Sequence, residues 1–122
     1  MRNLIMISLT SHLSNMGDEF FSILKLVSGE EIFALVCVDE SDDEPILILH
    51  NPIKMKTLSQ MNHLNYIKVT PWMEHSDEDM FVLKMDKVIT MIECHDQRLI
   101  KIYKQYIDEK DEEEDNVIES RS

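Results

Sequence analysis

The segment from Ile23 to Val38 constrains the fold more than any other, because it places two apolar runs on either side of the short polar turn Ser28-Gly29-Glu30. This pattern predicts a β-hairpin, with Gly29 at a turn position that needs a positive φ. Successive side chains of a strand point to opposite faces, and in the second run both faces are apolar. One face carries Ile32, Ala34, Val36 and Val38, and the other carries Phe33, Leu35 and Cys37. Such a strand must be covered on both sides, so we expect a small barrel to cover one face and a helix or a neighbouring subunit to cover the other.

Further strand segments follow, separated by acidic or polar loops. They are Ile46–Leu49 with its continuation Ile53–Thr57, then Tyr66–Met73, Met80–Met85 and Val88–Ile92. Asn51-Pro52 interrupts the first of them and predicts an edge, a bulge or a bend. Asp86-Lys87 separates the last two without a glycine or a proline, and we expect a single tight helical turn there. Short strands without βαβ alternation predict a mainly β fold, a small barrel of five or six antiparallel strands, with a β-sandwich as the alternative.

A single helix is expected after the last strand. Asp96 is a residue type that caps helix N-termini. One apolar stripe follows it, made of Leu99, Ile102, Tyr103, Tyr106 and Ile107. The spacing of the stripe predicts an amphipathic helix of roughly three turns that covers the outer sheet face. The acidic residues from Asp111 onward have little to bury, and we expect them to be disordered.

The length of 122 residues fits one domain. We expect a dispensable leader over residues 1–19, the barrel with its helix over 20–108, and an acidic disordered tail over 109–122. A secretory signal peptide is the weaker interpretation of the N-terminus, because the apolar run Leu4–Leu9 is short and no small-x-small cleavage site follows it. The formal net charge is −12, and half of it lies beyond Ile107. The rest of the chain has no basic excess either, which disfavours non-specific nucleic-acid binding.

No pattern of residues indicates catalysis or a metal site. Cys37 and Cys94 are too few for a disulfide framework and are typical of reduced apolar residues in an intracellular protein. The histidines follow no metal-ligand spacing, and the acidic segment Glu74–Asp79 lacks the glycine and the alternation of a calcium loop. No apolar run is long enough to span a bilayer. We expect a non-enzymatic protein with no catalytic residue, no metal, no cofactor and no membrane partner.

Two stretches of the chain resemble the Sm-like (LSm) family. The first runs from Leu26 to Leu49, and the second runs from Met80 to Ile92, where the family has a strand, a tight turn and a final strand. His50-Asn51-Pro52 and Thr70-Pro71-Trp72-Met73 are similar to the phage-type branch of the family, the Sm-like proteins of marine cyanophages. The resemblance extends from residue 20 to residue 107 and rests on strand patterns that also occur in unrelated barrels.

This resemblance implies an SH3-like barrel whose protomers close into a homo-oligomeric ring of about five to seven subunits. The last strand of one subunit would pair with its neighbour. The implied oligomer interface comprises Phe81, Leu83, Val88, Ile89 and Ile92. The helix departs from the family pattern, since family helices are usually N-terminal.

The uridine-binding pocket of the RNA-binding branch is not implied. That branch has an aspartate, an aromatic residue and an asparagine on the loop between its second and third strands, and an arginine-glycine pair in its second motif. The corresponding loop of this chain, Asp39–Pro45, has no aromatic residue and no asparagine, and Lys84-Met85 stands at the position of the pair.

One small surface is a candidate for contact with RNA or another anion. It comprises Lys54, Lys56, Lys68, Tyr66 and Trp72. Two lysines on paired strands would repel each other unless an acid, a phosphate or another subunit neutralises them, and the aromatic residues could stack on a base. The alternative is that Trp72 belongs to the core or an interface, and that the lysines pair with acidic side chains of a neighbour.

Two functions remain open at this point. The first is a non-enzymatic Sm-like module that assembles into a homo-oligomeric ring with an RNA-related role. The alternative is a phage-encoded protein-interaction module or structural scaffold that binds no nucleic acid. Both imply the cytoplasm of an infected bacterial cell, and the partners expected are the protein itself and, for the first function, RNA.

Overall fold

The computed structural model describes residues 18–59 and 65–121, and for residues 112–121 the backbone alone. Most of the predicted leader, residues 1–17, lies outside the described residues. The predicted hairpin is confirmed. It is formed by β1, Phe20–Leu26, and β2, Glu31–Asp39, which pair in an antiparallel ladder. Gly29 has a φ of 95°, and its N–H donates to the Leu26 carbonyl at 2.8 Å, so the turn uses the backbone freedom of glycine.

The third strand, β3 (Ile46–Ser59), changes partners along its length. Its first half pairs with β5 (Met80–Lys84), and its second half pairs with β4 (Asn65–Pro71). The change falls at the bulge between His50 and Ile53, where the register with β2 shifts and Asn51 has a φ of 46°. The bend predicted at Asn51-Pro52 is therefore confirmed, and it separates the barrel part of β3 from a projecting part.

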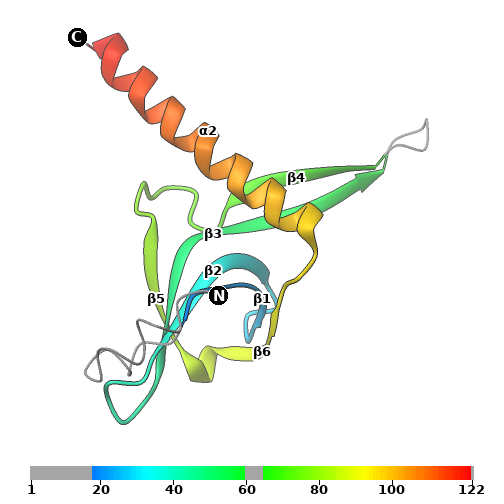
Figure 1. Ribbon diagram of the computed structural model, residues 1–122, viewed down its shortest axis with the longest axis vertical. Coiled ribbons are helices and arrows are strands. Elements are labelled where there is room, and N and C mark those ends of the chain that lie inside the picture. Colours follow the sequence, from blue (N-terminus) through cyan, green and yellow to red (C-terminus); the bar gives the residue numbers. More distant parts are fainter. Residues whose placement is uncertain (1–17, 60–64, 122) are drawn as a thin grey trace.

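The strands form one antiparallel sheet in the order β4-β3-β2-β1-β6, with β5 paired to β3. A 3₁₀ turn, η2 (Met85–Lys87), links β5 to β6 (Val88–Glu93) and is the predicted tight helical turn. Figure 1 shows the sheet curling so that β5 and β6 approach from opposite ends, while β3 and β4 continue together as a ribbon away from the barrel. This architecture confirms the predicted mainly β fold of six strands with one C-terminal helix.

The sheet has a separate apolar core on each face, as the alternation in β2 predicts. The core inside the barrel contains Leu24, Leu26, Ile32, Ala34, Val36, Leu47, Leu49 and Leu83. The core on the outer face contains Phe33, Ile53, Cys94, Ile100 and Tyr103. The last two belong to the helix α2 (Gln97–Arg121), which therefore covers the outer face. Figure 1 shows α2 crossing the ribbon of β3 and β4 in this view and running on to the C-terminus.

The start of α2 agrees with the predicted cap. The Arg98 N–H donates to the Asp96 carboxylate at 2.9 Å, and the Ile100 N–H donates to the Asp96 carbonyl at 3.1 Å. The length and the buried face differ from the prediction. The helix continues through the acidic segment to Arg121, well beyond three turns, because no glycine or proline ends it. The buried face centres on Ile100 and Tyr103, so Ile100, which the predicted stripe left out, is a core residue.

Two strand boundaries also differ. The predicted strand Tyr66–Met73 begins one residue earlier and ends at Pro71, so Trp72 lies just beyond β4. The long β3 extends to Ser59, and residues 60–64, which belong to the polar loop expected between Thr57 and Tyr66, lie outside the described residues.

Candidate functional site

The β3–β4 ribbon gathers four of the five predicted anion-contact residues on one face. Lys56 and Lys68 are directly opposite each other in the ladder, Lys54 is opposite Thr70, and Tyr66 is opposite Leu58. Residues two apart along a strand share a face, so Lys54, Lys56, Lys68 and Tyr66 form one surface, called here the lysine face. The opposite face of the ribbon carries Met55 and Val69, which pack toward α2.

Glu30 neutralises the part of the lysine face next to the barrel. Its carboxylate lies 3.7 Å from Lys54 Nζ and accepts a hydrogen bond from Trp72 Nε1 at 3.2 Å. The indole of Trp72 also meets the Phe81 ring edge-on, with 5.9 Å between the centroids, and packs against the barrel core. Trp72 is therefore a half-buried packing residue, and the structure does not place it with the lysines as an open stacking platform.

Lys56 and Lys68, unlike Lys54, are not neutralised by a described acidic side chain. Both side chains are exposed, and neither has an ion-pair partner among the residues that the structure describes. Directly opposed like charges destabilise a ladder. Tyr66, which shares their face, is 51% exposed. This part of the ribbon is therefore an open surface with two positive charges and an aromatic ring.

A second candidate site consists of the two strands at the open ends of the barrel. In the described part of the chain, β5 pairs only with β3, and β6 pairs only with β1. Both strands expose large apolar side chains: Met80 55% and Val82 64% on β5, Ile89 64% and Ile92 55% on β6. Open edges with apolar side chains are strong candidates for pairing with another chain.

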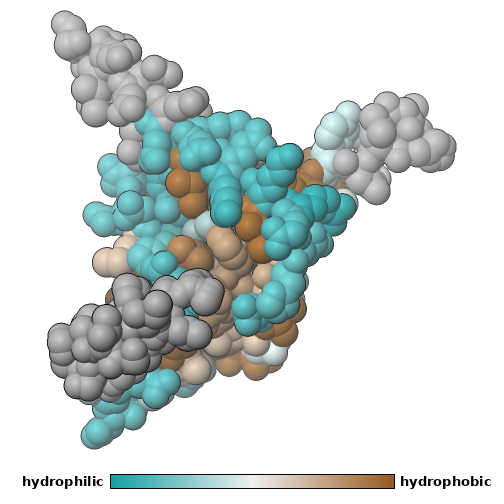
Figure 2. All heavy atoms as spheres, in the orientation of Figure 1, coloured by the Kyte–Doolittle hydropathy of each residue, from teal (hydrophilic) through white to brown (hydrophobic). Residues whose placement is uncertain are grey.

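The predicted interface residues divide between this surface and the barrel. Ile89 and Ile92 are exposed, whereas Leu83 is in the barrel core and Phe81 and Val88 are half-buried against it. Met80 and Val82 were not predicted. The alternation within Met80–Lys84 carries the signal that could have found them, because Phe81 and Leu83 face inward and their neighbours must face outward. Figure 2 shows apolar surface over the region of β1 and β6, below the hydrophilic band formed by α2.

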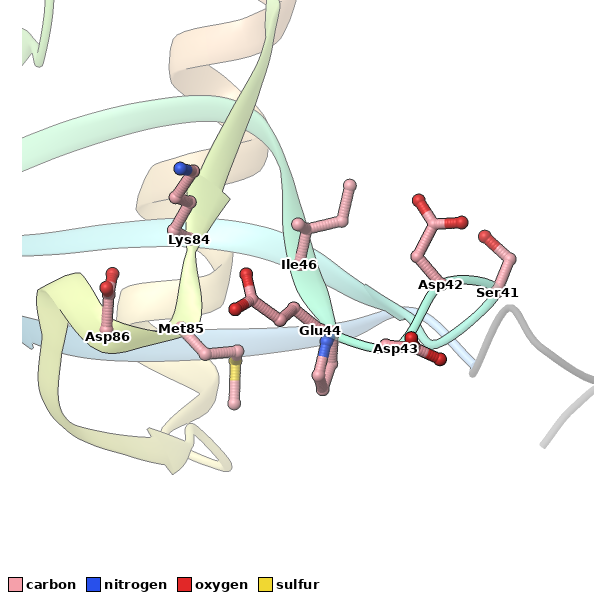
Figure 3. Close-up of a pocket in the computed structure, with 9 residues that line it drawn as sticks. Ser41, Asp42, Asp43, Glu44, Ile46, Lys84, Met85 and Asp86 are labelled. Atoms are coloured by element: carbon pink, nitrogen blue, oxygen red, sulfur yellow. The ribbon is translucent and has the colours of Figure 1, made fainter.

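A third feature is a pocket of about 730 Å³ where the β2–β3 loop meets η2. Figure 3 shows the loop residues on one side and Lys84, Met85 and Asp86 on the other. The residues that line it carry four carboxylates and one cation: Asp42, Asp43, Glu44 and Asp86, with Lys84. The preceding Asp39 carboxylate accepts hydrogen bonds from the hydroxyl and the N–H of Ser41, which lower the pKa of Asp39. The pocket is strongly negative and would repel a phosphate group.

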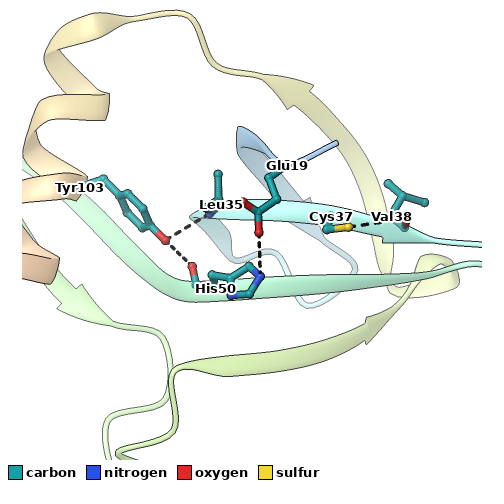
Figure 4. A network of polar contacts seen from close by, with 6 residues as sticks. All are labelled: Glu19, Leu35, Cys37, Val38, His50 and Tyr103. Atoms are coloured by element: carbon teal, nitrogen blue, oxygen red, sulfur yellow. Dashed lines mark hydrogen bonds and ion pairs between the residues drawn. The ribbon is translucent and has the colours of Figure 1, made fainter. Parts of the chain in front are cut away.

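Tyr103 connects α2 to the bulge in β3, as Figure 4 shows. Its hydroxyl donates a hydrogen bond to the His50 carbonyl and accepts one from the Leu35 N–H at 3.3 Å. The side chain is 1% exposed, and this burial raises the pKa of Tyr103 to about 12. Lys110 adds a second link from α2, since its Nζ lies 3.0 Å from Asn51 Oδ1. These contacts hold the bend that directs the ribbon away from the barrel.

The two cysteines are both buried, and desolvation raises the pKa of the Cys37 thiol. In the described part of the chain, no group of three or more His, Cys, Asp or Glu side chains could hold a metal ion. Across the same residues, no helix has the length and apolar character to cross a membrane.

The model of the family described as "Sm_like domain" matches residues 23–104. The matched region begins in β1, contains all of β2 to β6 and ends at the eighth residue of α2. A comparison with curated proteins gives no match.

Proposed function

The chain belongs to the Sm-like domain family, and from this premise we propose that it is a non-enzymatic assembly module whose protomers close into a homo-oligomeric ring. The observation that carries the proposal is the pair of open, apolar strand edges at β5 and β6. They lie at the two ends of the curled sheet and belong to different strands, so the contact is of the head-to-tail kind that generates a ring when the rotation closes.

Pairing of β5 with β6 of the next protomer would continue the sheet across the interface. Val82 on β5 and Ile92 on β6 are both on the outer face, because their ladder partners Ile48 and Ile23 are there. The same pairing would bring Met91, which packs toward the barrel core, beside the inward-facing side chains of β5. Complete burial of a Val or Ile side chain contributes about 1.5–3 kcal/mol, so several half-exposed residues offset a large part of the cost of association.

The proposed ring does not depend on RNA in the pocket between the β2–β3 loop and η2. The loop Asp39–Pro45 and Lys84-Met85 stand where the RNA-binding branch carries its uridine contacts. Here they line the pocket together with Asp86, and the lining residues carry four carboxylates. A phosphate approaching this pocket meets repulsion at short range. We therefore favour a protein-assembly role for the chain over an RNA-related role.

The proposal also covers the branch of the family and the cellular location of the protein. The phage-type branch is supported by the resemblance at His50-Asn51-Pro52, which the structure shows to be the bulge in β3. The cytoplasm of an infected bacterial cell follows from that branch.

Substitutions at the two edges test the ring. Val82→Lys and Ile92→Lys each place a charge on an edge while leaving the protomer core intact, because both side chains point outward and are more than half exposed. We expect either variant to reduce the mass measured by light scattering to that of a monomer. Met73→Lys is the matched control, since Met73 is an exposed apolar residue in the loop after β4. Oligomers of unchanged mass in both edge variants would overturn the proposed interface.

A further inference from the structure

The strand β4 is a third open edge, and the ring does not use it. In the described residues β4 pairs only with β3, and beyond Ile53 the ribbon has no other strand beside it. A two-stranded ribbon is marginally stable in water, and a third strand strengthens it. We propose that β4 and the lysine face dock an extended acidic segment of a partner protein, which adds to the ribbon as a third strand.

Charge is the first argument for an acidic partner. Lys56 and Lys68 oppose each other without an ion-pair partner among the described residues. The third lysine of the same face, Lys54, is neutralised by a carboxylate, because Glu30 lies 3.7 Å from its Nζ. A carboxylate from a partner would remove the repulsion between Lys56 and Lys68 in the same manner.

The open edge is the second argument, and it selects an extended segment. A strand added beside β4 would donate and accept backbone hydrogen bonds along Asn65–Pro71. Its side chains would alternate between the two faces of the ribbon, so acidic residues two apart would all lie on the lysine face. Tyr66, half-exposed on that face, would give the segment a flat apolar contact beside the charges.

A nucleic acid fits the same surface less well. It cannot pair with the backbone of β4, so it would depend on two lysines and one aromatic ring. Its phosphates would extend past the ribbon toward a chain of net charge −12. A short acidic peptide confines its charges to the lysine face and gains the backbone hydrogen bonds as well.

The experiment uses the full-length protein and a fluorescein-labelled peptide of about eight residues in which glutamate and threonine alternate, a length that matches a typical strand. Fluorescence anisotropy at low salt is expected to show saturable binding that weakens as salt is added. The double variant Lys56→Gln/Lys68→Gln should reduce the affinity by about fivefold or more. Lys101→Gln is the matched control, an exposed lysine on α2, and should leave the affinity unchanged.

A second peptide, of the same sequence but methylated at every backbone nitrogen, tests the strand pairing. It keeps the charge but has no backbone N–H to donate, so we expect its affinity to be lower by about fivefold or more. Absence of binding by the first peptide, or equal binding of the two peptides, would overturn the proposal. So would tighter binding of an oligouridine RNA that is lost in the same double variant, because it would assign the lysine face to nucleic acid.

The inference does not require the ring, since β4 is open in a single protomer. Light scattering on each sample separates the two proposals. Peptide binding by a monomeric protein would overturn the ring alone, and a ring that binds no peptide would overturn this inference alone. Circular dichroism of the double variant is expected to match that of the wild type, because removing two opposed charges relieves repulsion.

Discussion

The Tyr103 hydroxyl on α2 donates a hydrogen bond to the His50 carbonyl on β3, and so a helix side chain completes the ladder where the bulge opens it. The Leu35 N–H donates to the same hydroxyl at 3.3 Å, and Leu35 is the register partner of His50. One buried hydroxyl therefore satisfies two backbone groups that the bulge would leave without a partner. This contact couples the helix to the direction of the ribbon.

Removal of this hydroxyl should destabilise the fold. Tyr103→Phe keeps the ring contacts with Phe21 and Phe33 but takes away the hydrogen-bond partner of the half-buried Leu35 N–H and His50 carbonyl. We expect the free energy of unfolding to fall by about 1–3 kcal/mol, measured by urea denaturation. Tyr66→Phe is the control, since Tyr66 is exposed, and it should change stability little. Equal stability of Tyr103→Phe and the wild type would contradict the role of the hydroxyl.

Ionisation of Tyr103 should destabilise the fold at alkaline pH. Burial raises the pKa of Tyr103 from 10.0 to about 12, so between these values the unfolded tyrosine loses its proton while the folded one keeps it. The contribution of Tyr103 is complete below pH 10 and is lost as the pH rises toward 12. The difference in unfolding free energy between wild type and Tyr103→Phe should shrink by roughly 2–3 kcal/mol over this range. Subtracting the variant removes the titration of the lysines, and a constant difference would contradict the prediction.

Gly29 tests the turn between β1 and β2. Its φ of 95° is strained for any residue with a Cβ, and no atom beyond its two chain neighbours lies within 4 Å of the position that a Cβ would take. Gly29→Ala should therefore cost about 1–2 kcal/mol through backbone conformation alone. Gly29→Asn should cost less, because asparagine tolerates positive φ better. Thermal unfolding followed by circular dichroism distinguishes the two variants, and equal losses would show that the backbone is not the cause.

The hydrogen bond from Trp72 to Glu30 should contribute more than the ion pair between Lys54 and Glu30. Glu30→Gln removes the partly exposed ion pair with Lys54, which is worth about 0–1 kcal/mol, but keeps an oxygen that accepts from the indole. Glu30→Ala removes both contacts. We expect the fluorescence of Trp72, the single tryptophan of the chain, to shift in Glu30→Ala and to stay unchanged in Glu30→Gln. Identical spectra for the two variants would contradict the hydrogen bond.

Much of the fold could be predicted because it follows from local alternation. The two faces of β2 predict the two cores, Gly29 predicts the turn, and Asn51-Pro52 predicts the bend. The buried face of α2 was harder, since Ile100 and Ile102 fit an apolar stripe almost equally well and packing against Phe33 and Ile53 decides between them. The acidic composition from Asp111 onward predicts disorder, whereas α2 continues to Arg121 because the segment contains no helix-breaking residue.

The candidate sites could be predicted only in part. The opposition of Lys56 and Lys68 across the β3–β4 ladder follows from the hairpin register and is present in the structure. The position of Trp72 does not follow from the hairpin register, because its hydrogen-bond partner Glu30 lies 42 residues away in the chain. The link from Tyr103 to His50 spans 53 residues and depends on a bulge whose exact register is a property of the folded sheet. Sequence patterns predict the faces of single strands, whereas such contacts depend on how the strands are assembled.

The most direct test of the assembly account is the mass of the full-length protein in solution, measured by light scattering at micromolar concentration. A ring of five to seven protomers of 14.4 kDa each predicts a single species of about 72–101 kDa. A monomer of 14.4 kDa over the whole concentration range would contradict the account, because the edges of β5 and β6 would then remain open in water.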